Sequence, residues 1–283
     1  MRKNRKWKNF AYIYANLEEI IPCIPRLKYS GIDVLINYAA GSTYPAHDIS
    51  MNEADLDTYM DLLAENGLQA CLQTFYAVEQ KDWGTLNYYI QRYKDHPACW
   101  GFSGDEEGQQ DIATRRTAYN YVKARTYKPF IECQTLMFYY TSNYSTGCHD
   151  IMFIEDYILT FEHVWGYEWA LNAFVNNAAN GIVPWKNILY NPQEPVVVIH
   201  ATWAGINTPY YPKEAFVDFH RLMMQNNLNI VGTGFFLWYH HDLPHELYYY
   251  TQHDEVQVHR DGIYNQSRLM DRTNPFPTRF AKK

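Results

Sequence analysis

Four carboxylates follow two short apolar runs of the chain: Asp105 and Glu106 follow the first run, and Glu155 and Asp156 follow the second. Cleavage of a glycosidic bond requires two facing carboxyl groups, one to protonate the leaving oxygen and one to act as nucleophile or to activate water. Like charges held close together also raise one pKa, which keeps one group protonated near neutral pH. These residues therefore favour such acid and base chemistry. Asp105, Glu106 and one member of the second pair are the candidates for its two roles, because strand alternation points only one of Glu155 and Asp156 inward.

The residues around the first pair support a functional role for it. Gly101 and Gly104 leave two positions near the end of the first run without a side chain. Glycine inside a strand often allows a ligand to approach closely. We therefore expect Asp105 and Glu106 to take part in catalysis or direct binding. For the next residue, Glu107, the better explanation is the helix dipole, which favours acidic residues in the first turn of a helix.

Short apolar runs alternate with longer amphipathic stretches along the whole chain, which is typical of parallel strands joined by helices. Eight strands are predicted, at 10–15, 33–38, 69–74, 99–103, 130–136, 151–155, 196–201 and 230–239. Helices are predicted at 17–29, 53–66, 83–94, 112–127, 161–177 and 212–225. Eight such units predict an α/β fold, a (β/α)8 TIM barrel, whose active site lies at the C-terminal ends of the strands.

The domain organisation follows from the same pattern. The connection at 138–150 has no helical period, so we expect a missing or irregular helix after strand five. Beyond residue 242 the chain becomes polar and rich in tyrosine and charge. We expect one barrel domain over residues 1–283, with the barrel at about 8–242 and a C-terminal extension at about 243–283 packed on it.

Aromatic and polar side chains are expected at the same rim of the barrel. Aromatic residues make up 17% of the chain, and their rings offer flat apolar walls with polar edges that suit sugars. A lone histidine is more often a hydrogen-bonding group than an acid or base, so His200 is assigned to substrate contact. Alternatively, the rim aromatics plug the mouth of the barrel. The candidate substrate contacts are Tyr38, Tyr139, Tyr157, His200, Trp203, Trp238, Tyr239 and His240.

One segment carries a family resemblance. Residues 96–107 read HPACWGFSGDEE, which resembles strand four of the cellulase superfamily of glycoside hydrolases, where H-P-A-x-x-G and an aromatic residue lead to Asn-Glu-Pro or Asp-Glu-Pro. The resemblance implies a TIM-barrel glycosidase with Glu106 as its acid/base, without singling out one family. Residues 149–157 (HDIMFIEDY) and 234–239 (GFFLWY) are similar to the sixth and eighth strands of the same group.

The chain departs from that group at strand seven. Retaining members place a nucleophilic glutamate there, whereas this chain has His-Ala-Thr-Trp at 200–203. The departure favours a carboxylate pair from strands four and six, assistance by the substrate, or a barrel without catalysis. Residues 104–106 are also similar to the Asp-Glu pair of hexosaminidase-type barrels, which implies Glu106 as the acid and Asp105 as the group that orients a substrate acetamido group.

Two further functions are compatible with the sequence. A metal-dependent barrel enzyme could use Glu106, Asp156 and His200 with His240 or Asp242, whose oxygen and nitrogen atoms suit a divalent ion. A barrel that binds a glycan or a protein without turnover would explain the missing strand-seven glutamate. The leading hypothesis is a glycoside hydrolase with a carbohydrate substrate, no cofactor and no metal, and with its oligomeric state open.

Composition excludes several classes of partner. The net charge of −7 and the pI near 5.9 give no basic field for nucleic acid, and no apolar run suggests a membrane span.

The five cysteines are odd in number and form no C-x-x-C pair, which predicts buried free thiols. The basic first nine residues precede no apolar signal core, so we expect a cytoplasmic protein, or a secreted or periplasmic one if an export signal was removed.

Overall fold

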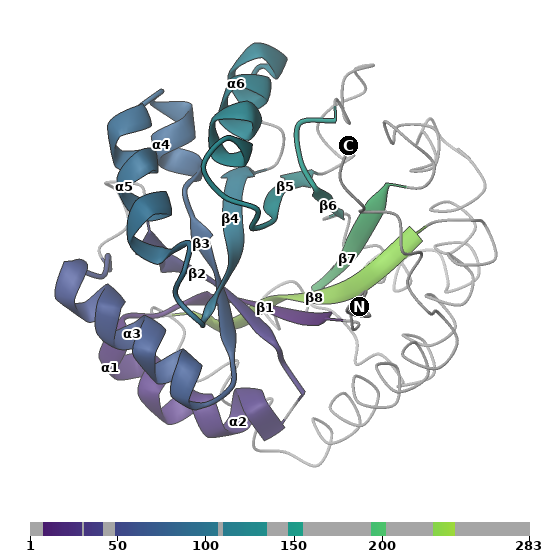
Figure 1. Ribbon diagram of the computed structural model, residues 1–283. Helices are drawn as coiled ribbons and strands as arrows, with labels where there is room; N and C mark the ends of the chain where they lie inside the picture. Colours follow the sequence, from purple (N-terminus) through teal and green to yellow (C-terminus); the bar gives the residue numbers. More distant parts are fainter. Residues whose placement is uncertain are drawn as a thin grey trace, which may run out of the picture.

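The computed structural model describes residues 8–29, 31–41, 49–106, 110–134, 147–154, 194–201 and 229–240. Eight parallel strands follow one another around a closed barrel, and the last pairs with the first (Figure 1). They are β1 (Lys8–Tyr14), β2 (Val34–Gly41), β3 (Gln69–Gln73), β4 (Cys99–Asp105), β5 (Phe130–Gln134), β6 (Ile151–Ile154), β7 (Pro195–Ala201) and β8 (Asn229–His240). All eight predicted strands are present, and the predicted (β/α)8 TIM barrel is confirmed.

The described helices lie outside strands β1 to β5 (Figure 1). They are α1 (Leu17–Ile20), α2 (Ile24–Tyr29), α3 (Glu53–Glu65), α4 (Phe75–Glu79), α5 (Trp83–Tyr93) and α6 (Ile112–Lys123). The helix predicted at 17–29 is interrupted by a 3-10 turn at Ile21–Cys23, where Pro22 removes a backbone donor. None of the described helices is long and apolar enough to cross a membrane.

Several sequence predictions differ from the structure or fall outside it. Helix α4 was not predicted, because five residues are too few to show a helical period. Helix α6 ends at Lys123, four residues before the predicted end at 127. The predicted helices at 161–177 and 212–225, most of the connection at 138–150 and the C-terminal extension lie outside the described residues.

Local side chains set the helix ends. Asn16 caps α1 through a capping box with Glu19, and Asn52 caps α3 by accepting the N–H of Asp55. After α3 the chain turns through Gly67, which has a φ of +69°. A left-handed glycine at this position ends a helix at low cost, so only three residues separate the end of α3 from the start of β3.

Side chains of the strands fill two separate apolar layers. The layer inside the barrel is built from alternate strand residues: Phe10, Tyr12, Val34, Ile36, Cys71, Ile131, Cys133, Ile151, Phe153, Val197, Ile199 and Val231. Phe10 packs edge-to-face on Trp100 and on Phe153, with both pairs of ring centroids 4.9 Å apart. The other strand residues form the outer layer with the helices. All five cysteines are buried and free, as predicted.

The two glycines of β4 make room for protein atoms rather than for a ligand. A Cβ on Gly104 would overlap the ring of Phe130, and a Cβ on Gly101 would lie 2.6 Å from the carbonyl oxygen of Pro129. Both contacts belong to the packing of β5 against β4. The expectation that these glycines open the strand end to a ligand is therefore wrong.

Gly104→Ala should lower the free energy of unfolding by about 1–3 kcal/mol, because Phe130 is completely buried and its ring cannot turn away. Gly84→Ala is the control. A Cβ on Gly84 would lie 3.3 Å from Oδ1 of Asp82, the N-cap of α5, which needs a shift of only a few tenths of an ångström, so a change of less than about 0.5 kcal/mol is expected. Denaturant unfolding of both variants measures the difference, and equal stability of the two would refute this account of β4.

Candidate active site

Glu106 follows the last residue of β4 and therefore stands at the barrel mouth, the end of the barrel formed by the C-terminal ends of the strands. The hydroxyl of Tyr38, on β2, donates a hydrogen bond to Oε1 of Glu106. Tyr38 continues the row of alternate β2 residues, Val34 and Ile36, that face the inside of the barrel. Two of the predicted site residues are thus brought together from positions 68 residues apart.

Aromatic rings from two strands gather around Tyr38. Its ring centroid lies 5.9 Å from that of Tyr12 on β1, 6.5 Å from that of Tyr14, also on β1, and 6.5 Å from that of Phe236 on β8. Tyr12 and Phe236 are themselves 5.8 Å apart. Sequence reasoning placed Tyr12 and Phe236 inside strands but not in the site. The result is a carboxylate beside a cluster of aromatic side chains.

Asp105 lies in different surroundings from its neighbour. Its side chain is completely buried. One carboxylate oxygen accepts the backbone N–H of Gln110 at 3.1 Å, and the other accepts the side-chain N–H of Gln134 at 2.8 Å. The second oxygen is also 3.5 Å from Nε of Arg115, on α6. Asp105 therefore faces α6 and β5, whereas Glu106 contacts Tyr38.

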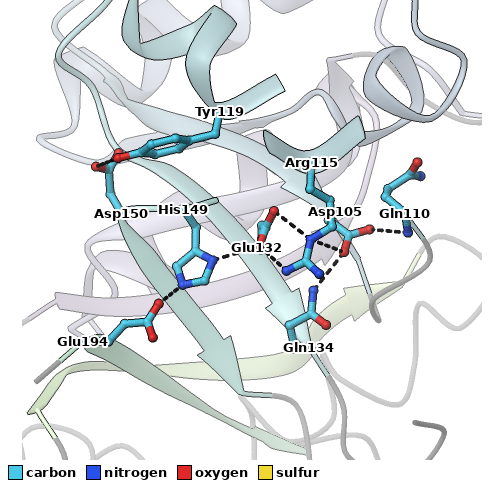
Figure 2. A network of polar contacts seen from close by, with 9 residues as sticks. All are labelled: Asp105, Gln110, Arg115, Tyr119, Glu132, Gln134, His149, Asp150 and Glu194. Atoms are coloured by element: carbon cyan, nitrogen blue, oxygen red, sulfur yellow. Dashed lines mark hydrogen bonds and ion pairs between the residues drawn. The ribbon is translucent and has the colours of Figure 1, made fainter. Parts of the chain in front are cut away.

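Asp105 belongs to a buried network of charged groups that sequence reasoning missed (Figure 2). Arg115 binds Glu132 of β5 with two hydrogen bonds, at 3.0 and 2.5 Å. Glu132 also contacts Nδ1 of His149 at 2.8 Å, and Nε2 of the same imidazole contacts Glu194, just before β7. Negative and positive groups thus alternate from the end of β4 to the start of β7. Glu132 inside an apolar run was the one signal of this network in the sequence, since buried acidic residues need partners.

The network changes the titration of its members. Burial, and next the charge of Glu132, raises the pKa of Asp105 to about 8, although Arg115 opposes the rise. Burial alone would lower the pKa of His149, but its hydrogen bonds to Glu132 and Glu194 outweigh burial and raise it to about 9. Burial would raise the pKa of Glu132, but His149 and Arg115 lower it overall. His149 is therefore cationic and Glu132 anionic at neutral pH.

The remaining candidate residues fall where the side chains are not described. Glu155, Asp156, Tyr139, Tyr157 and Trp203 lie outside the described residues, as does Asp242 of the alternative metal set. His200 lies on β7, and Trp238, Tyr239 and His240 lie on β8, where the structure describes the backbone alone. Among the side chains that are described, no three His, Cys, Asp or Glu groups are arranged to hold a metal ion.

Comparison with known proteins gives the fold. No protein-family model matches the sequence, and no curated protein matches it. A chitinase from Bacteroides thetaiotaomicron superposes with a TM-score of 0.57 at 9% identity, over 96% of this chain and 100% of that one. A glycoside hydrolase family 18 N-acetylglucosaminidase from Paenibacillus barengoltzii gives 0.56 at 9% identity, over 92% and 100%.

A larger enzyme shares the same barrel. The β-glucuronidase from Ruminococcus gnavus gives a TM-score of 0.51 at 10% identity, over 82% of this chain and 43% of that one. This chain thus matches less than half of the length of the glucuronidase. The structural neighbours are glycoside hydrolases with TIM barrels, and at these identities the likeness establishes the fold alone.

Arg115→Met should lower the free energy of unfolding by about 3–5 kcal/mol, because it leaves buried carboxylates without their shared cation. Arg116→Met is a matched control, since Arg116 is the next residue of α6 and is exposed. It should change stability by less than about 0.5 kcal/mol. Denaturant unfolding compares the two, and a small loss in both would contradict the importance of the network.

Stability should fall as the pH rises from 6 to 9. His149 has a raised pKa in the folded protein, so its contribution is complete below about 6.5, the unfolded value, and is lost as the pH rises through about 9. The titration of His149 alone should lower the free energy of unfolding by up to about 3 kcal/mol over this range. The raised pKa of Asp105 acts in the same direction. Urea unfolding at a series of pH values should show this decline in the wild type and a flatter one in His149→Gln; equal slopes would exclude His149 as its source.

Proposed function

We propose that this protein is a glycoside hydrolase that cleaves a glycosidic bond in an oligo- or polysaccharide, with Glu106 as general acid. The observation that carries the proposal is the carboxylate of Glu106 at the mouth of a closed TIM barrel, held by Tyr38 beside aromatic rings. Active sites of this fold lie at that end of the barrel. The structural neighbours support the same class of reaction, since a chitinase and a glucuronidase act on glycosidic bonds.

The arrangement suits protonation of a leaving oxygen. A general acid has to be held at a fixed angle to the scissile bond, and the Tyr38 hydroxyl fixes one oxygen of the Glu106 carboxyl group. The half-buried rings of Tyr38 and Phe236 would offer apolar faces to the sugar, and the buried ring of Tyr12 packs against both. The carboxylates of the protein carry out the reaction in this proposal, so it needs no cofactor.

The second carboxylate of the proposed reaction comes from strand six. Asp105 is buried against α6, and the end of β7 carries His200 where the resembled enzymes have a glutamate. Glu155 or Asp156 then acts as nucleophile or as base for water, unless the substrate supplies its own nucleophile. The separation of the two carboxyl groups decides between these roles, at about 5–5.5 Å for retention and about 6.5–9.5 Å for inversion.

Glu106→Gln should lower kcat on a responsive glycan by about 100-fold or more, as loss of a general acid does. Glu107→Gln removes the same charge one residue away and should stay within a few-fold of wild type. Release of reducing sugar from a broad glycan panel, with and without a chelator, measures both. An aryl glycoside with a good leaving group should restore part of the Glu106→Gln rate, because that leaving group needs no proton.

Other outcomes identify the other functions. Glycan binding without turnover in the wild type would leave a binding barrel. Turnover that a chelator abolishes would identify a metal-dependent enzyme. Equal losses in Glu106→Gln and Glu107→Gln would remove Glu106 from the role of general acid.

A further inference from the structure

The contacts of Asp105 are those of an anchor rather than of a reacting group. Asp105 is 0% exposed, so its carboxylate has no route to a substrate at the barrel mouth. It accepts the N–H of Gln110, which lies five residues further along the chain. This hydrogen bond joins Gln110 to the end of β4, and Glu106 lies in the stretch of chain between the two bonded residues. A residue that holds both ends of this segment limits how the Glu106 side chain can turn.

The anchor is itself held from two sides, by β5 and by α6. Gln134 of β5 donates to one oxygen of Asp105 at 2.8 Å, and Arg115 of α6 lies 3.5 Å from the same oxygen. Arg115 is in turn fixed by its two hydrogen bonds to Glu132, which is completely buried and also contacts His149. Figure 2 shows these groups as one continuous chain of contacts beside β5. Moving Asp105 would therefore disturb paired charges on two other elements.

We infer that Asp105 is a positioning residue: its buried carboxylate holds the backbone N–H of Gln110 and so sets the orientation of Glu106 toward Tyr38. This inference rests on the proposed role of Glu106 as general acid. It requires an oxygen acceptor at Asp105, and it requires no proton transfer by that carboxylate. A catalytic Asp105 would instead have to contact the substrate.

Two substitutions separate these roles. Asp105→Asn keeps an oxygen for Gln110, and its new amide can donate to Gln134 once that carboxamide has turned. Asp105→Ala removes the acceptor. Asp150→Ala is the control for a simple loss of stability. Asp150 accepts the N–H of Phe130 at 2.9 Å and pairs with Lys123 at 2.8 Å, and it lies just before β6, at the other end of the strands.

The first measurement is hydrogen exchange in a peptide covering residues 106–112, and it needs no substrate. Asp105→Ala should raise the exchange rate at the Gln110 amide by about tenfold or more, because the hydrogen bond that protects it is gone. Asp105→Asn and Asp150→Ala should exchange there at close to the wild-type rate. Unchanged protection in Asp105→Ala would overturn the inference, whether or not the protein hydrolyses glycans.

The second measurement is the separation of kcat from KM on a glycan that the wild type cleaves. Asp105→Ala should lower kcat by about 100-fold with little change in KM, since a small misplacement of a catalytic group costs that much. Asp105→Asn should keep kcat within about fivefold of wild type, because it keeps the acceptor that positions Glu106. Loss of activity in Asp105→Asn equal to that in Asp105→Ala would make the carboxylate itself catalytic and overturn the inference. Absence of turnover in the wild type would instead count against the proposed function, and the exchange rates would still decide whether Asp105 anchors the segment.

Discussion

The paired hydrogen bonds between Arg115 and Glu132 are the interaction on which the end of β4 depends. Both side chains are buried, and a buried charge is costly unless it is paired. Arg115 stands between Glu132 and Asp105, so one guanidinium group is shared by two buried acidic side chains. His149 does the same between Glu132 and Glu194. Strands β4 to β7 are therefore joined by charge pairs in addition to backbone hydrogen bonds and apolar packing.

This network explains why two adjacent acidic residues occupy different environments. Along a strand, neighbouring side chains point to opposite faces, so the end of β4 can place one carboxylate in the outer layer and the next at the mouth. Asp105 meets Arg115 and Gln134 in the outer layer. Glu106 meets Tyr38 at the mouth. The acidic pair that the sequence presents as a single motif is thus two groups with separate tasks.

The barrel was predictable because its signals are local. Each strand is a short and mostly apolar segment, and Asn52 and Gly67 mark the ends of α3 within a few residues of the helix itself. The network was not predictable, because its members come from elements separated by up to 89 residues and no spacing links Asp105 to Glu194. Gly104 shows the same limit: its neighbour is the ring of Phe130, which the sequence of β4 does not contain. The sequence predicted that Glu106 and Tyr38 both lie at the mouth. It did not predict their contact, which depends on the closure of the barrel.

The filling of the barrel interior explains where a polar anchor for Glu106 can come from. Phe10 packs against both Trp100 and Phe153 inside the barrel, which leaves the mouth as the place for chemistry. Apolar side chains cannot fix the orientation of a carboxyl group, because that takes directional hydrogen bonds. Tyr38 donates one such bond to Glu106 directly, and on this assignment Asp105 in the outer layer holds the chain that follows Glu106, through a charged network where apolar packing is often at least as stable. The network is then retained for the orientation it imposes at the end of β4 rather than for the stability it adds.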